Sequence, residues 1–204
     1  DVSGSMMDAD KLPLLKRSLA LLVADLRPED SVAIVVYAGA SGVVLPPTSG
    51  REPGKILAAL ERLEAGGSTN GGAGIELAYA LAQQSFRAGG INRVILATDG
   101  DFNVGVTGHD ELVSLVEQQR KSGVFLSVLG FGRGNLNDHT MEQLADKGNG
   151  NYAYIDSERE ATKVLVTEAA GTLVTVARDV KLQVEWNPAA VSAYRLIGYE
   201  NRML

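Results

Sequence analysis

The stretch RVILATDGD, residues 93–101, decides the fold class of this chain. It opens with a mostly apolar run, typical of a strand buried inside a sheet, and it ends at once in acidic residues and glycine. Similar runs lie on both sides of it, and we expect strands at 31–37, 43–45, 124–130 and 152–155. The β-branched run at 31–37 should be buried on both faces, and the two prolines at 46–47 should end the strand before them.

Helical periodicity fills the intervals between these runs. Apolar residues recur at helical spacing over 10–26, and we expect further helices at 53–64, 73–87, 109–121, 138–147 and 158–177. Because strands alternate with helices, right-handed crossovers should place helices on both faces of one sheet. The sequence therefore predicts an α/β fold with a doubly wound, mostly parallel sheet over residues 1–177.

The pattern changes after residue 177. Val180, Leu182, Val184 and Trp186 alternate with polar residues, which predicts a half-exposed strand, followed by a turn at Asn187 and a partner strand at 191–199. We therefore expect residues 178–204 to be the truncated start of a short β-rich C-terminal extension.

The beginning of the chain carries a second expectation. Asp1 resembles a residue at the carboxyl end of a strand, so the fold calls for about six more apolar residues before it, the usual strand length. The first central strand is therefore expected to be missing from this sequence. A segment upstream of it would be the place for a signal or a membrane anchor.

Composition excludes several classes of function. The 204 residues carry a net charge of -6 with no long basic run, which argues against nucleic-acid binding. Cysteine is absent and only His109 and His139 supply imidazole, so zinc-thiolate sites, cysteine nucleophiles and a Ser-His-Asp triad are poorly supplied. No stretch approaches the roughly 20 apolar residues that span a bilayer. The apolar and charged fractions, 45% and 22%, are typical of a soluble globular protein.

Three loops supply oxygen ligands. They contain Asp1, Ser3 and Ser5, then Ser68 and Thr69 in a glycine-rich setting, then Asp99 after the run at 93–98. In a doubly wound sheet, loops after neighbouring strands meet at the switch point. Carboxylates and hydroxyls without sulfur suit Mg²⁺, Mn²⁺ or Ca²⁺. Because few of these groups are charged, the ion should stay electrophilic and accept an incoming carboxylate.

This order of residues resembles the von Willebrand factor type A domain and its metal-ion-dependent adhesion site (MIDAS). The resemblance implies that Ser3, Ser5 and Thr69 bind the metal directly and that Asp1 and Asp99 bind it directly or through water. It also implies a protein-binding module, not an enzyme, with Mg²⁺ as the first expected cofactor and Mn²⁺ or Ca²⁺ as alternatives. A partner protein's Asp or Glu would take the last coordination position.

Two short segments resemble the bacterial branch of that family: GGSTNGG at 66–72 and ATDGDFN at 97–103. The end of the chain, from Asn187 to Arg202, resembles an uncharacterised extension that follows the domain in some bacterial envelope proteins. The resemblance implies a place in the bacterial cell envelope or periplasm. A domain without a central strand would also expose a sheet edge, through which two copies could pair.

Other interpretations remain open from the residues alone. Asp-x-Ser-x-Ser is also common before helices, where side-chain oxygens cap free N–H groups. Asp101 and Asn103 resemble part of a calcium loop, but Val104 stands where an EF-hand needs glycine. A phosphoryl-transfer enzyme of haloacid-dehalogenase type would use Asp1 as its nucleophile, although Ser3 replaces its second aspartate. No loop lysine is obvious for it, though Lys11 and Lys121 exist. A metal that only stabilises the fold is the third alternative.

Overall fold

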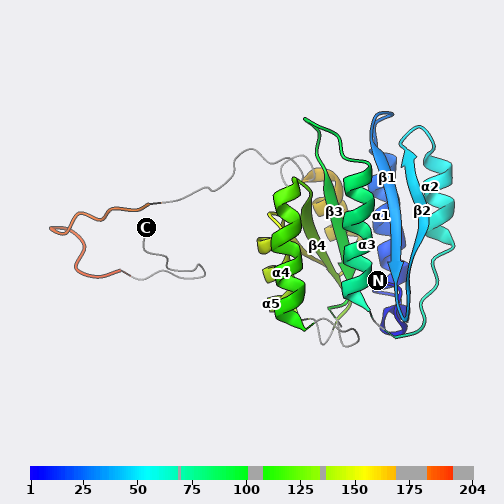
Figure 1. The fold of residues 1–204 in the computed structure, drawn as a ribbon. Coiled ribbons are helices and arrows are strands. Elements are labelled where there is room, and N and C mark those ends of the chain that lie inside the picture. Colours follow the sequence, from blue (N-terminus) through cyan, green and yellow to red (C-terminus); the bar gives the residue numbers. More distant parts are fainter. Residues whose placement is uncertain (69, 101–107, 134–136, 169–182, 195–204) are drawn as a thin grey trace. The chain divides into compact units, whose positions relative to one another are not determined.

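The computed structural model of the chain, shown in Figure 1, describes residues 1–68, 70–100, 108–133, 137–168 and 183–194. The chain divides into two compact units, Asp1–Val174 and Thr175–Leu204. The first unit contains every helix and strand in the described part of the chain.

The strands of the first unit form two hydrogen-bonded groups. Strand β1 (Ser31–Tyr37) pairs antiparallel with β2 (Ser41–Ser49). Strands β3 (Arg93–Thr98), β4 (Phe125–Phe131) and β5 (Tyr152–Ile155) form a parallel sheet in the order β3-β4-β5. The parallel strands are connected through helices, so the predicted α/β class is confirmed.

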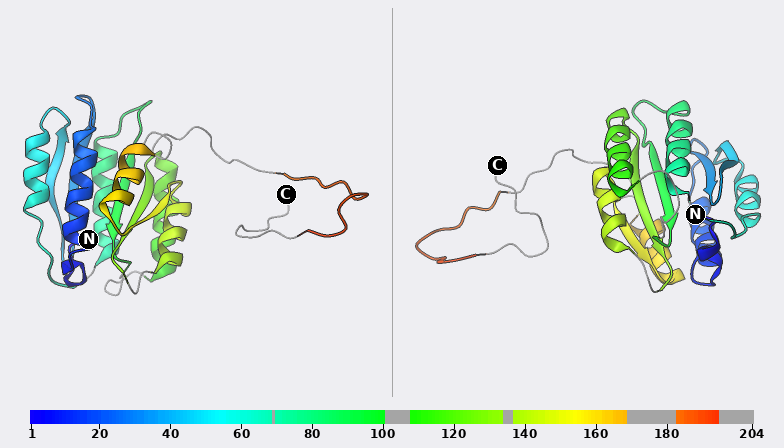
Figure 2. Two further views of the ribbon diagram at one scale, coloured as in Figure 1. Left: turned by 180° about the vertical axis from the view of Figure 1, so that it is seen from behind. Right: turned by 60° about the horizontal axis from the view of Figure 1, so that its bottom comes forward.

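Helices cover both faces of these strands. The α-helices in the described ranges are α1 (Leu12–Ala24), α2 (Pro53–Glu61), α3 (Gly71–Gln84), α4 (His109–Gln119), α5 (Asp138–Lys147) and α6 (Glu158–Thr162). The same ranges also contain the 3-10 helices η1 (Gly4–Met7) and η2 (Arg120–Ser122) and the π-helical turn η3 (Lys163–Thr167). Helices α3 and α4 lie in front of the strands in Figure 1, whereas α1 and α6 lie on the opposite side, as the left view of Figure 2 shows.

Two hydrophobic clusters match these two layers. One joins α1, α2 and α6 to the back of the strands, and the other joins α3, α4 and α5 to the front. Strand β4 lies between them, and all seven of its residues are buried. A strand buried on both faces needs a continuous apolar run, which is what the sequence has there.

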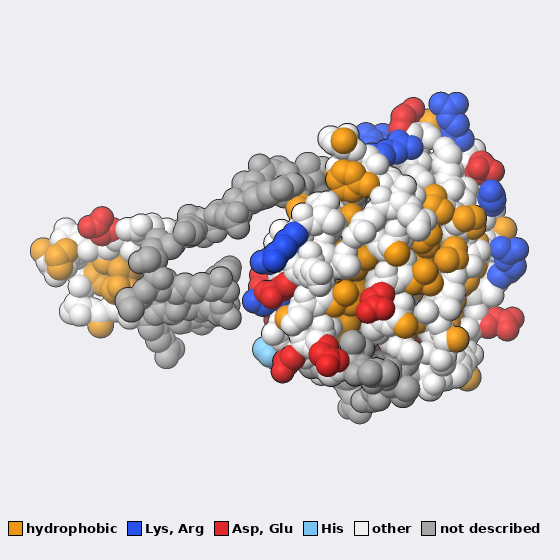
Figure 3. Space-filling view, viewed as in Figure 1, with side chains coloured by type: hydrophobic (Ala, Val, Ile, Leu, Met, Phe, Trp, Pro, Cys, Tyr) orange, Lys and Arg blue, Asp and Glu red, His pale blue; other side chains and the backbone are white. Residues whose placement is uncertain are grey.

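Strand β1 corrects one expectation. It is not buried on both faces: only Tyr37 is buried and Ala33 is exposed. Figure 3 shows hydrophobic side chains at the surface over β1 and β2. The reason is that α3 covers only part of this pair, whereas an apolar run by itself does not reveal how much of a face a helix covers.

Strand β2 corrects a second expectation, which concerns where the strand ends. The prolines at 46–47 do not end it, and it continues to Ser49. Both prolines are exposed, and the β1–β2 register shifts between Val32 and Ile34, opposite this part of β2. Proline is tolerated at such a place because an edge strand with a bulge does not need every N–H donor.

The helix predicted at 158–177 also differs from the continuous α-helix expected there. It changes from α6 to the π-helical turn η3 at Lys163, and residues 169–182 lie outside the described part of the chain.

In the second unit, residues 183–194 contain no strand, so the strand expected to continue through Trp186 is wrong for its described part. The turn at Asn187 is confirmed, because its carbonyl accepts from the Ala190 N–H at 3.0 Å. Polar and apolar residues alternate at 183–186, but these residues form no strand pairing. An isolated strand without a partner is not stable. Trp186 and Tyr194 instead lie with ring centroids 5.7 Å apart.

The first residues of the chain connect β1 to β3. The Asp1 backbone nitrogen donates to the Ala97 carbonyl of β3 at 2.9 Å, and the Val2 N–H donates to the Tyr37 carbonyl of β1 at 3.0 Å. These bonds place Asp1 between the carboxyl ends of two strands, as predicted from the loop positions.

Candidate functional site

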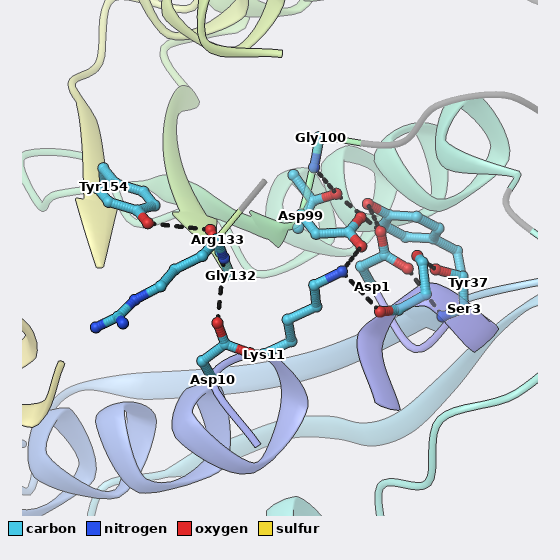
Figure 4. A network of polar contacts seen from close by, with 12 residues as sticks. Asp1, Ser3, Asp10, Lys11, Tyr37, Asp99, Gly100, Gly132, Arg133 and Tyr154 are labelled. Carbon is cyan, nitrogen blue, oxygen red and sulfur yellow. Dashed lines mark hydrogen bonds and ion pairs between the residues drawn. The ribbon is translucent and has the colours of Figure 1, made fainter. Parts of the chain in front are cut away.

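The Asp1 carboxylate lies at the centre of a buried polar network, which Figure 4 shows from close by. Only 9% of the residue is exposed. Its Oδ1 accepts from the Ser3 backbone N–H at 2.9 Å, and its Oδ2 accepts from the Thr98 hydroxyl at 2.8 Å and the Tyr37 hydroxyl at 3.3 Å. Burial raises the pKa of the Tyr37 phenol, so this group remains a donor at neutral pH. The network therefore fixes the carboxylate between β1 and β3.

Ser3, just before η1, and Ser5, on η1, lie beside this carboxylate. Ser3 is 1% exposed, and its hydroxyl lies 2.9 Å from the hydroxyl of Ser5. Ser3 occupies the position before η1, but its side chain makes no capping hydrogen bond. The helix-cap interpretation is therefore wrong for Ser3, and its hydroxyl is directed toward that of Ser5.

The spacing of the two hydroxyls fits a small divalent ion. Mg²⁺ binds oxygen at about 2.0–2.1 Å in octahedral geometry, so two adjacent ligand oxygens are about 2.9 Å apart. Ser3 Oγ and Ser5 Oγ, which share a hydrogen bond, have the same separation of 2.9 Å. Among the described residues no three His, Cys, Asp or Glu side chains gather as a metal cluster.

The glycine-rich second loop is bonded to the first. The Gly4 N–H donates to the Gly67 carbonyl at 2.9 Å, and the Gly66 N–H donates to the Val2 carbonyl at 2.8 Å. Gly67 has a φ of 78°, a left-handed conformation that favours glycine. Thr69, the predicted ligand on this loop, lies outside the described residues, as do Asp101 and Asn103 of the calcium-loop alternative.

Asp99 follows β3 and is 7% exposed. Its Oδ2 lies 3.0 Å from the ammonium nitrogen of Lys11, which also donates to the Ser5 carbonyl at 2.9 Å. The Lys11 side chain thus connects the first and third predicted loops, as Figure 4 shows. The ion pair is largely shielded from water, with 17% of the lysine side chain and 5% of the aspartate side chain exposed.

Three residues of this network were not among the predicted ligands. Tyr37 and Thr98 are the last residues of β1 and β3, so their place at the carboxyl ends of two apolar runs was an available signal. Lys11 lies directly before the first long helix and has no comparable signal, because its reach to Asp99 depends on how that helix packs.

The two histidines take no part in the described network. His139 is exposed on α5, and His109 is the first residue of α4, with its side chain outside the described set. No helix in the described ranges is both long and apolar enough to cross a membrane.

Comparison with known families matches the chain in two parts. Residues 1–168 match the family described as the von Willebrand factor type A domain. Residues 171–204 match a family described as the C-terminal part of the uncharacterized protein YfbK. The resemblance inferred from the motif, including a bacterial extension after the domain, is thereby confirmed.

Among curated proteins, the chain is 55% identical over 204 residues to the uncharacterized protein YfbK of Escherichia coli K12. The match covers 100% of this chain but 36% of that protein. The chain thus spans little more than a third of the length of the curated relatives it matches.

Solved structures show the same fold. An aerotolerance-related membrane protein from Bacteroides fragilis is 25% identical, with a TM-score of 0.70 over 84% of this chain and 96% of that one. The manganese-loaded TRAP protein of Plasmodium vivax is 19% identical, with a TM-score of 0.63 over 81% of this chain and 70% of that one. At this identity the second likeness concerns the fold alone.

Proposed function

The chain belongs to the von Willebrand factor type A domain family, and from that premise we propose that its first unit binds a partner protein through a divalent cation. The ion would hold an Asp or Glu side chain of the partner, as at a MIDAS. The observation that carries this proposal is the pair of hydroxyls, Ser3 Oγ and Ser5 Oγ, 2.9 Å apart beside a buried carboxylate.

The ligand set we propose is Ser3, Ser5 and Thr69 in direct contact, with Asp1 and Asp99 direct or through water. Both Asp1 oxygens accept hydrogen bonds from the protein, so this carboxylate is suited to orienting Ser3 and the bound water around the ion. When bound, the cation supplies a Lewis acid for an incoming carboxylate. Mg²⁺ is the first candidate, with Mn²⁺ and Ca²⁺ as alternatives.

We also propose that binding, not catalysis, is the activity of this site. One observation favours the phosphoryl-transfer alternative, because Lys11 supplies the lysine that the sequence did not place there. However, both oxygens of the candidate nucleophile Asp1 are engaged as acceptors, and the residue is 9% exposed. An aspartate held in this way is poorly suited to attack a phosphorus atom. Hydrolysis of a generic phosphate ester that depends on Mg²⁺ and is lost in Asp1→Asn would reverse this choice.

The setting of the domain is part of the proposal. The bacterial relative and the Bacteroides fragilis protein, described as a membrane protein, support the expectation of a cell-envelope or periplasmic location. We propose a domain boundary near residue 177, with residues 178–204 beginning a separate extension. An exposed sheet edge, left by the missing central strand, is the surface through which two copies would pair. The net charge of -6 argues against a nucleic-acid partner.

Calorimetric titration tests the metal site. We expect the wild-type chain to bind Mg²⁺ and Mn²⁺, and Ser3→Ala and Ser5→Ala each to weaken that binding by at least about tenfold, a loss typical of a disturbed ligand shell. Ser114→Ala is the matched control, since that serine is exposed on α4 and bonds only its own helix in the contacts described. Equal Mg²⁺ affinity in the wild type and both site variants would refute the metal site.

A second measurement separates binding from a purely structural ion. Acetate, a minimal stand-in for an Asp or Glu side chain, is titrated into the Mn²⁺-loaded chain while the relaxation rate of water protons is followed. We expect acetate to displace ion-bound water and lower the relaxation enhancement. An unchanged enhancement, together with a large loss of thermal stability in EDTA, would favour the structural alternative.

A further inference from the structure

Lys11 is held in place by three segments of the first unit. It is the residue directly before α1, four residues after the end of η1. Its aliphatic stem lies over Gly132 at the end of β4, where an added Cβ would lie 2.6 Å from Cε and 2.7 Å from Cγ. Its ammonium reaches Asp99 at the end of β3. Because Gly132 has no side chain, the Lys11 stem has room to pass over it and reach the site.

The resulting ion pair differs from the others on the molecule. In the other ion pairs described, at least one side chain is 40% exposed or more, whereas both members of the Lys11–Asp99 pair are below 20%. Exposed pairs are screened by water and contribute little. A shielded pair interacts more strongly, so the Lys11 charge acts on whatever else approaches Asp99.

We propose that Lys11 is a built-in counter-cation that lowers the affinity of this site for a divalent ion and keeps the loaded site attractive to a carboxylate. This inference rests on the metal-binding function proposed above. An ion that engages Asp99 must share the carboxylate with an ammonium only 3.0 Å from its Oδ2. The ammonium also repels any cation held by Ser5, whose carbonyl it contacts at 2.9 Å.

Formal charge explains the second half of the proposal. Asp1, Asp99 and Lys11 together carry one net negative charge, and a divalent ion turns this into one net positive charge. Without the lysine, the two carboxylates would neutralise the ion completely. The Lys11 charge therefore keeps the loaded site electropositive, which favours a partner's Asp or Glu. Lys11 thus acts as a positioning and charge-setting residue, with no bond to the metal.

The test compares Lys11→Met, which keeps an unbranched stem and removes the charge, with Lys11→Arg, which keeps the charge. Lys55→Met is the matched control. Lys55 lies on α2 and forms an exposed ion pair with Glu52, the residue before that helix, so this variant also removes one lysine charge. Titration of the whole chain with Mg²⁺ should show about tenfold tighter binding for Lys11→Met. Lys55→Met should stay within about twofold of the wild type. Lys11→Arg keeps the charge, so its Mg²⁺ affinity should stay closer to that of the wild type than the affinity of Lys11→Met does. Acetate should bind the Mn²⁺-loaded Lys11→Met chain more weakly.

Melting temperatures guard against a folding artefact. In EDTA, Lys11→Met should melt below the wild type because Asp99 loses a charged partner, and Mg²⁺ should raise its melting temperature by more than it raises that of the wild type. Equal Mg²⁺ affinity and equal Mg²⁺-induced shifts in wild type and Lys11→Met would overturn this inference and leave the metal site standing. If neither protein binds Mg²⁺ or Mn²⁺, the proposed function and this inference both fail.

Discussion

At the scale of single residues, the described network is built around a carboxylate that is costly to bury. A carboxylate removed from water is stable only when donors replace its hydration, and Asp1 has three of them. Two of these donors, Tyr37 and Thr98, come from side chains at strand ends. The arrangement of Ser3 and Ser5 therefore depends on residues that are not themselves predicted to touch the ion.

The two donors should differ in their contribution to stability. Thr98 donates to Asp1 at 2.8 Å and also accepts from the Gly100 N–H at 3.1 Å, whereas the Tyr37 bond is longer, at 3.3 Å. We expect Thr98→Val to lower the free energy of unfolding by about 2–3 kcal/mol and Tyr37→Phe by about 0.5–1.5 kcal/mol. Urea denaturation measures both.

Thr48→Val provides the control for that comparison. This threonine is 2% exposed, but its hydroxyl bonds a neutral carbonyl, that of Pro46 at 2.8 Å. Its loss should cost about 1 kcal/mol, typical of a neutral hydrogen bond. A smaller loss for Thr98→Val than for Thr48→Val would mean that the Asp1 carboxylate is not held as the structure shows.

At the scale of elements, α3 is positioned against β1 by a close contact. An added Cβ at Gly74 would lie 2.5 Å from Cδ1 and 2.8 Å from Cβ of Tyr37, closer than real atoms approach. The glycine therefore allows the helix to pack directly on the tyrosine that donates to Asp1. In this way the packing of a helix determines the geometry of a polar group at the end of a strand.

Gly74→Ala should consequently destabilise the domain. Overpacking at a buried contact costs about 1–3 kcal/mol, and here the shift would also move Tyr37 away from Asp1. Gly54→Ala is the matched control, because α2 has nothing within 4 Å of an added Cβ there. That substitution should be neutral or stabilise by up to about 1 kcal/mol through helix propensity. Thermal unfolding of both variants measures the difference, and similar effects would contradict the close contact.

Element boundaries were only partly predictable. The helix at 138–147 and the strand at 152–155 have their predicted bounds, because Asn137 caps the helix and glycines end it. The prolines of β2 misled the prediction, because their effect depends on whether the strand is at an edge. The π-helical turn after α6 has no local sequence rule that announces it.

At the scale of the whole molecule, the described core of the first unit ends before the extension begins. The last buried residue of its hydrophobic clusters is Leu165. The first unit extends to Val174 by its internal packing. We therefore propose that the domain folds without the residues that follow.

A truncated chain ending at Val174 should melt within about 2 °C of the whole chain, since a 1 kcal/mol change shifts the midpoint of a domain of this size by about 2–4 °C. A chain ending at Thr162 is the contrast, because it removes the buried Leu165 and should melt several degrees lower. Calorimetric melting of the three chains measures this. A large loss of stability in the chain ending at Val174 would show that the extension belongs to the folded domain.

The sequence by itself determined the α/β class, the parallel strands and the set of candidate ligands. These features follow from local patterns: apolar runs of strand length, helical periodicity between them, and polar residues directly after the runs. The order Asp1, Ser3, Ser5, Thr69, Asp99 pointed to a hydroxyl-rich site, because strand ends in such a sheet converge.

Only the tertiary structure decided how these residues are held. That Tyr37 and Thr98 donate to Asp1, and that Lys11 reaches Asp99 across Gly132, depends on distances between segments far apart in the chain. The same holds for the open face of β1 and the continuation of β2 through its prolines. Local patterns do not encode such contacts, because a side chain's partners are set by the packing of whole helices on the sheet.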